Sequence, residues 1–181
     1  SKYNLLELEK SGFRNSYILG IPFNVKKWIK TSVHENIRDP FKILYVGRIV
    51  PNKRQEDLIR LLFVLKQLDK RYNVSLVGYS DIPIYKNYLS LCIDSLGLNE
   101  SVQFLSGLSE DSLAEEYLSS GFFIIMSEHE GFCVPLLEAM RFELPIVAFD
   151  SSAVSETLGG AGILFDSKDN FNKLAVIIHS L

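Results

Sequence analysis

The sequence has little cysteine and no long apolar run. Among 181 residues only Cys92 and Cys133 are cysteines, and they do not have the Cys-x-x-Cys spacing of zinc or redox sites. Two isolated cysteines give no disulfide framework, so we expect a reducing, cytoplasmic environment. No apolar stretch approaches the ~18 residues that a bilayer span needs, and no signal-peptide pattern is visible.

A strong charge of one sign and a metal-ligand pattern are also missing. The formal net charge is -3, which gives no electrostatic case for a nucleic-acid partner. His34, His129 and His179 are scattered without metal-ligand spacing, and Asp-x-Asp occurs nowhere. We therefore expect neither a metal nor another cofactor.

The composition that is present fits one folded domain covering residues 1–181. Hydrophobic residues make up 47% and charged residues 23%, as in soluble globular proteins of a size that buries a sizeable core. The sequence starts without Met in a helical pattern and ends at Leu181 in another. We expect a piece of a longer protein, in which residues 1–40 are an entry helix, a strand and a connector.

Short apolar runs alternate with helical patterns along the chain. We expect strands at 16–19, 42–46, 73–78, 102–105, 122–126, 144–149 and 162–165. We expect helices at 3–12, 53–70, 84–96, 109–119, 134–142 and 170–181. This alternation predicts an α/β fold, a Rossmann-like three-layer domain whose parallel sheet is flanked by helices. Ligands bind such sheets at the carboxyl ends of the strands.

Two carboxylates eight residues apart mark the most informative stretch, Ser127-Glu-His-Glu-Gly-Phe-Cys-Val-Pro-Leu-Leu-Glu-Ala-Met140. Glu130 is expected in a strand-to-helix loop and Glu138 one turn into the helix that Pro135 opens. The loop N–H groups and the positive helix end would point at the space between them. This arrangement suits a phosphate flanked by hydroxyl groups, as in a nucleotide sugar.

Together with Ile43-Leu-Tyr-Val-Gly-Arg-Ile-Val-Pro-Asn-Lys-Arg-Gln-Glu-Asp-Leu-Ile59, this motif resembles the signature of the retaining glycosyltransferase 4 family, or "glycosyl transferases group 1". The resemblance runs over roughly residues 13–181. It implies the C-terminal, donor-binding half of a GT-B fold, with the N-terminal acceptor-binding domain absent.

The resemblance also implies roles for single residues near the donor's phosphates and sugar. Arg48 and Lys53, after the Gly47 turn, would bind the diphosphate. Glu130 is the candidate catalytic residue, lying near the transferred sugar, where it would hold hydroxyls or steady positive charge. A nucleophile role like that of retaining hydrolases stays open. Gly131 and Phe132 would offer N–H groups to the sugar and the distal phosphate.

The nucleoside would be bound by two further sites. Glu138 would accept hydrogen bonds from the ribose hydroxyls, and the main chain of Gly107 and Leu108 would meet the base. Arg54 stands where the family usually has Gly, so it could crowd the approach or add a third cation. The basic run Lys26–Lys30 could touch an anionic membrane surface, although a solvated connector is the favoured interpretation.

The function that this resemblance implies is transfer of a hexose from a nucleoside diphosphate sugar to an acceptor glycan or lipid-linked glycan, in polysaccharide biosynthesis. The acceptor would be bound through the missing domain, without a metal, in the cytoplasm or at the inner membrane face. The alternatives are a nucleotide-sugar 2-epimerase, a glycogen synthase-like enzyme, or a non-catalytic nucleotide-binding or partner-binding domain.

Overall fold

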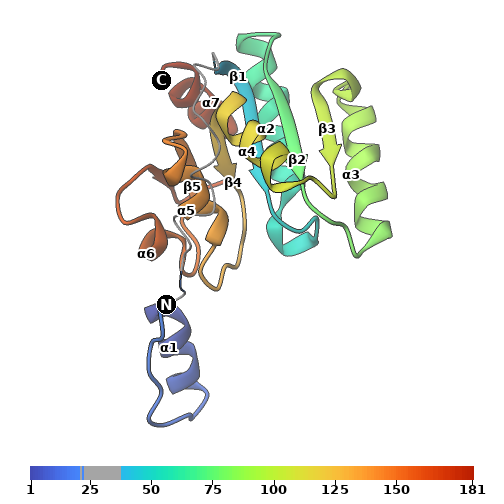
Figure 1. Cartoon of the computed structure of the whole chain (residues 1–181). Coiled ribbons are helices and arrows are strands. Elements are labelled where there is room, and N and C mark those ends of the chain that lie inside the picture. The colour runs from blue at the N-terminus through green and yellow to red at the C-terminus, as the bar shows by residue number, and fades with distance from the viewer. Residues whose placement is uncertain (21, 23–37) are drawn as a thin grey trace.

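A parallel sheet with strand order β3-β2-β1-β4-β5-β6 forms the centre of the molecule (Figure 1). The computed structural model describes residues 1–20, 22 and 38–181. The strands are β1 (Asp39–Val46), β2 (Asn73–Val77), β3 (Val102–Leu105), β4 (Ser120–Ile125), β5 (Ile146–Phe149) and β6 (Ile163–Phe165). The helices are α1 (Lys2–Lys10), α2 (Gln55–Leu68), α3 (Pro83–Ser95), α4 (Glu110–Ser119), α5 (Val134–Arg141), α6 (Val154–Leu158) and α7 (Phe171–His179). Two 3₁₀ turns, η2 (Pro51–Lys53) and η3 (Asn99–Ser101), complete the described elements.

The strand order has a reversal between β1 and β4. From β1 the chain adds β2 and β3 on one side, then crosses back so that β4, β5 and β6 extend the other side. Both neighbours of β1 pair with it in parallel. In doubly wound sheets, ligands bind in the crevice at such a switch point. The predicted α/β, Rossmann-like fold class is confirmed.

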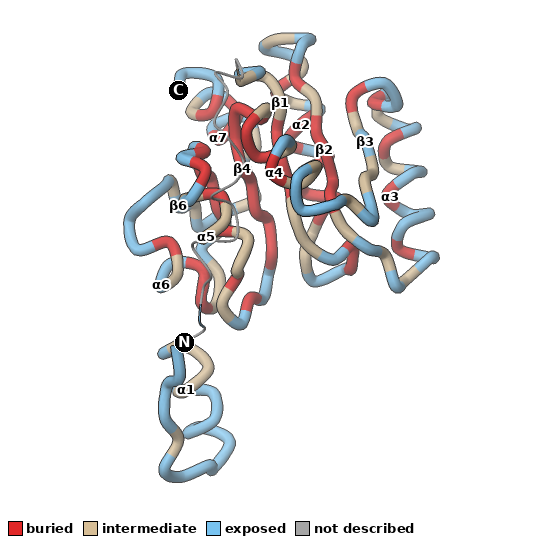
Figure 2. The backbone as a smooth tube through the Cα atoms, viewed as in Figure 1, coloured by how far each residue is buried: buried red, intermediate tan, exposed pale blue. Residues whose placement is uncertain are grey.

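Successive side chains of β1 pack into two separate hydrophobic cores, one on each face of the sheet. Ile43 and Tyr45 join the apolar cluster that includes residues of α2, α3 and α7. Leu44 joins the cluster with residues of α4, α5 and α6. This period of two is the strand geometry that places successive side chains on opposite faces. Figure 2 shows the buried tube running along β1, β2 and β4 in the middle of the molecule.

The observed elements differ from the predicted ones in three main ways. The helix expected from 53 begins at Gln55, because Arg54 has left-handed backbone angles between η2 and α2. The strand expected at 16–19 is wrong, since residues 11–20 contain no strand. The one-turn helix α6 was not expected. The other expected helices and strands are present, with ends shifted by a few residues.

Part of the predicted entry region lies outside the described residues. This applies to Lys26–Lys30, to His34 and to the connector up to 37, so their predicted roles stay predictions. Within the described ranges, no helix combines the length and apolar character required to traverse a bilayer.

Candidate functional site

The loops that follow β1 and β4 meet at the switch point of the sheet. The Glu128 N–H donates to the Asn52 carbonyl across 2.9 Å, which joins the two loops directly. Beside this junction is a cavity of about 270 Å³. Its walls are Tyr45, Val46, Gly47, Arg48, Lys53, Ile125, Glu130, Cys133, Val134 and Pro135. The structure therefore brings together four of the predicted site residues: Gly47, Arg48, Lys53 and Glu130.

Buried hydrogen bonds hold the backbone of the loop after β1. The Arg48 carbonyl accepts from Gln55 Nε2 at 2.9 Å and from the Tyr45 hydroxyl at 3.1 Å. The Tyr85 hydroxyl lies 2.9 Å from Gln55 Oε1, and it accepts from the Gln55 N–H. With its carbonyl fixed in this way, Arg48 presents an exposed side chain at the cavity.

Close packing of two glycines aligns this loop with the next strand. A Cβ placed on Gly78 would lie 1.8 Å from the Gly47 carbonyl oxygen. The Gly47 N–H donates to the Val77 carbonyl oxygen, and the Gly78 N–H donates to the Leu105 carbonyl oxygen. Only glycine at position 78 permits this contact, so the ends of β1, β2 and β3 form one continuous edge.

Lys53 and Glu130 form an ion pair across the cavity. Lys53 Nζ lies 2.6 Å from Glu130 Oε1, and the two side chains are only 14% and 11% exposed. Lys53 Nζ also donates to the His129 carbonyl at 3.3 Å. The predicted phosphate-binding cation and the predicted sugar-side carboxylate thus neutralise one another.

Ser152, after β5, fixes the backbone at Glu130. The Glu130 N–H donates to Ser152 Oγ at 2.7 Å, and this hydroxyl donates to the Glu130 carbonyl at 3.1 Å. Ser151, its neighbour, donates from its hydroxyl to the Ser127 carbonyl. Two serines at the carboxyl end of β5 therefore set the path of the loop that carries Glu130.

Two other ionisable groups in the cavity wall stay neutral near pH 7. Burial raises the pKa of the Cys133 thiol to about 12, and the nearby Glu130 carboxylate adds to this effect. Burial also raises the pKa of Tyr45 well above its usual range, again with a contribution from Glu130. Cys133 is therefore not a thiolate nucleophile in this site.

Arg54 is occupied by carboxylates and does not line the cavity. Its guanidinium lies 3.0 Å from Glu56, 3.0 Å from Asp57 and 3.3 Å from Glu128. The Asp57 hydrogen bond is the main cause that raises the pKa of Arg54. Because these carboxylates already balance the charge of Arg54, this side chain does not offer the ligand a third cation, which was one of its two predicted effects.

Glu138 lies on α5, outside the cavity walls that contain Glu130. It is half-buried, and its Oε2 accepts a hydrogen bond from the Tyr117 hydroxyl at 2.9 Å. The predicted positions of both glutamates are confirmed, with Glu130 in the loop and Glu138 past the first turn of the helix. Their ligand contacts stay predictions.

The carbonyl groups of Gly131 and Phe132 are held by other parts of the chain. The Gly131 carbonyl accepts from Asn4 Nδ2 at 3.1 Å, and the Phe132 carbonyl accepts from the Thr157 hydroxyl. The Tyr3 ring also packs edge-on against the His129 ring. Figure 1 shows α1 projecting from the sheet next to this loop.

Gly107 and Leu108 lie after β3, which β2 and β1 separate from β4. Gly107 is exposed in a left-handed conformation, and Leu108 packs against the core beneath α4 and α5. A smaller cavity of about 190 Å³ includes the adjacent Ser106, with Gly78 and Tyr79. The structure therefore places the two residues along the same sheet edge as Glu130 but not in its cavity.

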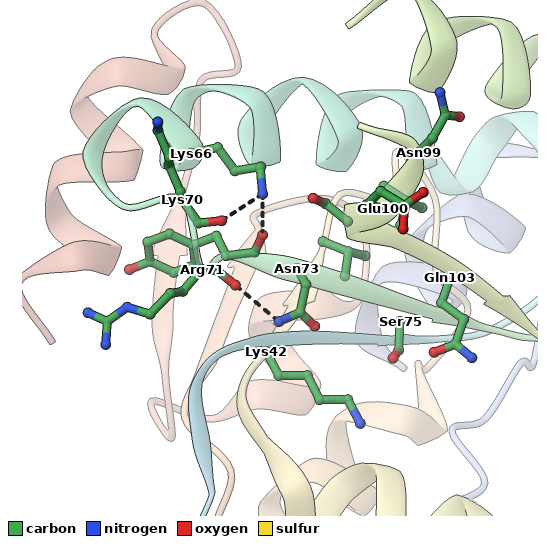
Figure 3. A pocket seen from close by; sticks show the side chains of 13 residues that line it. Lys42, Lys66, Lys70, Arg71, Asn73, Ser75, Asn99, Glu100 and Gln103 are labelled. Carbon is green, nitrogen blue, oxygen red and sulfur yellow. Dashed lines mark hydrogen bonds between the residues drawn. The ribbon is translucent and has the colours of Figure 1, made fainter. Parts of the chain in front are cut away.

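A larger cavity, about 720 Å³, lies at the opposite edge of the sheet. Its residues come from the amino ends of β1, β2 and β3 and from the segments before them. Figure 3 shows that the cationic ends of Lys42, Lys70 and Arg71 do not converge there. Lys42 pairs with Glu116, and Arg71 pairs with Asp69. Size alone therefore does not identify the functional site.

Comparison with protein families identifies the family of this chain. A sequence model of the family "Glycosyl transferases group 1" matches residues 26–181. The chain belongs to the group 1 glycosyltransferase family.

Curated relatives of this group 1 domain include a mannosyltransferase and a second glycosyltransferase. "O-antigen chain mannosyltransferase B" of Escherichia coli is 28% identical over 76% of this chain and 36% of its own length. "Amylovoran biosynthesis glycosyltransferase AmsD" of Erwinia amylovora is 28% identical over 87% of this chain and 44% of its own length. The chain thus spans less than half the length of these relatives.

Solved structures share the fold of the group 1 domain. Anabaena Alr3699/HepE in complex with UDP and glucose has a TM-score of 0.81 at 22% identity, covering 99% of this chain and 51% of that one. The C-terminal domain of the group 1 protein LpcC from Francisella tularensis has a TM-score of 0.68 at 19% identity, with 89% of this chain and 83% of that one covered. Both confirm the glycosyltransferase type of Rossmann-like fold.

Several residues around the site of the group 1 domain were not predicted from sequence. Ser151 and Ser152 could have been found, because they follow an expected strand at its carboxyl end. Tyr117 and Asn4 carry no such signal, since only the tertiary packing brings them to Glu138 and Gly131. For metals, the residues in 1–20, 22 and 38–181 include no group of three or more His, Cys, Asp or Glu suited to bind an ion.

Proposed function

We propose that this chain is the donor-binding domain of a retaining glycosyltransferase, which moves a hexose from a nucleoside diphosphate sugar to an acceptor. The observation that carries the proposal is the cavity at the switch point, where Arg48, Lys53 and Glu130 converge from two loops. Cations beside an acidic acceptor group suit a diphosphate joined to a hydroxyl-rich sugar.

The diphosphate would be bound by charge. Arg48, which is exposed at the cavity, would contact the diphosphate first, through the N–H donors of its planar guanidinium. Lys53 would then exchange its contact with Glu130 for the phosphate oxygens, and the released carboxylate would accept from the sugar hydroxyls. Because both side chains are largely buried, their charges are screened less by water than surface charges are.

The nucleoside and the sugar would extend from the diphosphate in opposite directions. Glu138 would take the ribose hydroxyls, and the edge toward Gly107 and Leu108 would take the base. Gly131 and Phe132 would donate N–H groups to the sugar and the distal phosphate. Glu130 would then lie nearest the bond that breaks, where a carboxylate steadies developing positive charge.

The names of the similar proteins support the substrate class. One is named a mannosyltransferase of O-antigen, and one structural neighbour holds UDP and glucose. The acceptor, which we propose to be a glycan or lipid-linked glycan, would be bound by a further domain of the whole protein. The shares of 36% and 44% of the relatives' lengths leave room for one.

Calorimetry with the 181-residue chain tests the proposal. UDP, GDP and ADP, and then UDP-glucose and GDP-mannose, are titrated into the chain, and at least one is expected to bind in the millimolar range or tighter. The same chain is expected to transfer no sugar to added glycans, because we propose that the acceptor is bound by a further domain of the whole protein. No binding of any of these ligands at millimolar concentration would overturn the donor-binding role. Robust transfer by the chain alone would contradict the half-enzyme part.

A further inference from the structure

Tyr117 is a fully buried tyrosine whose hydroxyl ends beside the helix of the proposed donor site. It belongs to α4, whereas its hydrogen-bond partner Glu138 belongs to α5. The hydroxyl donates to Glu138 Oε2 at 2.9 Å. The hydroxyl thus connects the interior of the domain with a half-buried carboxylate at its edge.

Aromatic packing fixes the position of this hydroxyl. The Tyr117 ring stacks on Phe142 with ring centres 5.1 Å apart and planes only 9° from parallel. On another side it lies 5.9 Å from the Phe123 ring, tilted by 35°. Stacked arrangements of this kind are favourable, and a buried ring has few other rotamers. The oxygen of Tyr117 is therefore a fixed point from which the carboxylate is held.

The hydroxyl also keeps its proton. Burial, followed by the negative charge of Glu138, raises the pKa of Tyr117 far above its usual range. Tyr117 therefore remains a hydrogen-bond donor to Glu138 at neutral pH. A donor of this kind restrains one oxygen of the carboxylate and leaves the second, Oε1, to other partners.

We infer that Tyr117 is the positioning residue of the donor site, holding Glu138 Oε2 so that Oε1 meets the ribose hydroxyls of the nucleotide. The inference rests on the proposed function, in which Glu138 binds ribose. A glutamate on a helix surface has three rotatable side-chain bonds, and ordering them on binding costs free energy. Fixing the carboxylate beforehand removes part of this cost from the binding step.

A Tyr117→Phe variant removes the hydroxyl and retains the ring that packs between Phe142 and Phe123. The probes are UDP and 2′,3′-dideoxyuridine diphosphate, or the guanosine pair if GDP binds more tightly. We expect the affinity for the ribose form to fall by about threefold to tenfold, the value of a typical hydrogen bond. The affinity for the dideoxy form should change less than twofold, because it lacks the groups that Glu138 contacts.

Tyr72→Phe is a matched control. Tyr72 is also buried, packs edge-on against Phe41, and shares one hydrogen bond with a side chain, 3.2 Å from His179 Nδ1. It lines the cavity at the amino ends of the strands, far along the sheet from the switch point. Both variants should lose similar thermal stability, but only Tyr117→Phe should lose preference for ribose.

The double variant Tyr117→Phe/Glu138→Gln separates the possible results. The inference expects the two losses to be non-additive, because Tyr117 acts through Glu138. Additive losses, or equal weakening of the ribose and dideoxy forms by Tyr117→Phe, would show a merely structural hydroxyl and overturn it. Unchanged ribose preference in Tyr117→Phe, alongside a lost preference in Glu138→Gln, would overturn it and leave the proposed function intact. Unchanged preference in Glu138→Gln would instead refute the ribose role itself.

Discussion

At the residue scale, the Lys53–Glu130 pair determines how the site responds to an anion. Glu130 Oε1 lies 2.6 Å from Lys53 Nζ, so a diphosphate that binds here would compete with a carboxylate for the same ammonium. The carboxylate also repels the phosphates as long as nothing else neutralises it. The pair therefore compensates two largely buried charges, and it should weaken the binding of an anion that carries no sugar.

Substitutions of the two residues of this pair should have different effects on diphosphate affinity. Lys53→Met should weaken UDP or GDP by about tenfold or more, because a charge-assisted contact is lost and Glu130 becomes unpaired. Glu130→Gln should leave plain diphosphate affinity equal or tighter, since Lys53 becomes free to bind phosphate. Calorimetry of both variants with the nucleoside diphosphate and with its sugar measures these shifts.

The control for this prediction is Lys66→Met at the opposite edge of the sheet. Lys66 donates to the Lys70 and Tyr72 carbonyls, so its loss removes a cation without touching the switch point. Its affinity for the diphosphate should match the wild type. If Glu130→Gln weakens the plain diphosphate as much as Lys53→Met does, the pair holds the fold of the loop and does not oppose the ligand.

Sequence could predict the residues that carry this chemistry but not those that orient it. Arg48, Lys53 and Glu130 follow strands whose parallel arrangement brings their carboxyl ends together, so their meeting was foreseeable. The ion pair between Lys53 and Glu130 was not foreseeable, because side-chain contacts depend on distances that a pattern does not fix. Tyr117 reads in the sequence as one more core residue of a helix, and only its burial next to α5 reveals a second role.

At the element scale, the start of α2 depends on one residue in an unfavourable conformation. Arg54 has φ of 54° and ψ of 43°, the left-handed region that costs a non-glycine residue about 1–2 kcal/mol. In return its side chain reaches the buried carboxylates of Glu56 and Asp57. Asp57 also contacts Lys168, so the cap connects α2 to the segment before α7. The position that the family usually fills with Gly is thus an ion-pair centre in this chain.

Comparing Arg54→Gly with Arg54→Ala separates backbone strain from side-chain contacts. Both variants lose the carboxylate contacts and should be less stable than the wild type. The Ala variant also retains the left-handed strain, so it should be less stable than the Gly variant by about 1 kcal/mol, or roughly 2–4 °C in Tm. Thermal unfolding followed by circular dichroism measures the order. In a regular helix, Gly is less stabilising than Ala. If Arg54→Ala is more stable than Arg54→Gly, the left-handed conformation at this position is refuted.

The same scale shows where periodicity fails as a predictor. The apolar spacing of α2 and the buried strands β1 and β4 was readable because long or strongly apolar segments leave a clear pattern. The Tyr-Ile-Leu run at 17–19 looked like a strand, but a strand needs a neighbour to accept its hydrogen bonds, and a pattern does not supply one. Helix α6 has a single turn, too short for a period of 3.6 residues to show.

At the scale of the whole molecule, the two edges of the sheet differ in what their charges do. The larger cavity, at the amino ends of the strands, has several cations, but these are paired or point apart. At the carboxyl ends, Arg48 and Lys53 share a cavity in which Glu130 is the one carboxylate among the described residues of the wall. An anionic ligand therefore gains more at the smaller cavity, and protein groups can supply the neutralisation that it requires.

Donor binding by the whole domain should accordingly not depend on a divalent ion. With EDTA in excess, the Kd for the nucleoside diphosphate should stay within about twofold, because Arg48 and Lys53 supply the charge that a metal would otherwise bring. A saturating ligand at a hundred times its Kd should raise the unfolding free energy by about 2.7 kcal/mol, with or without EDTA. Calorimetry and thermal unfolding measure the two quantities independently. A tenfold weaker Kd in EDTA that magnesium or manganese restores, together with loss of the thermal shift, would show that the phosphates are neutralised by a metal and not by these two side chains.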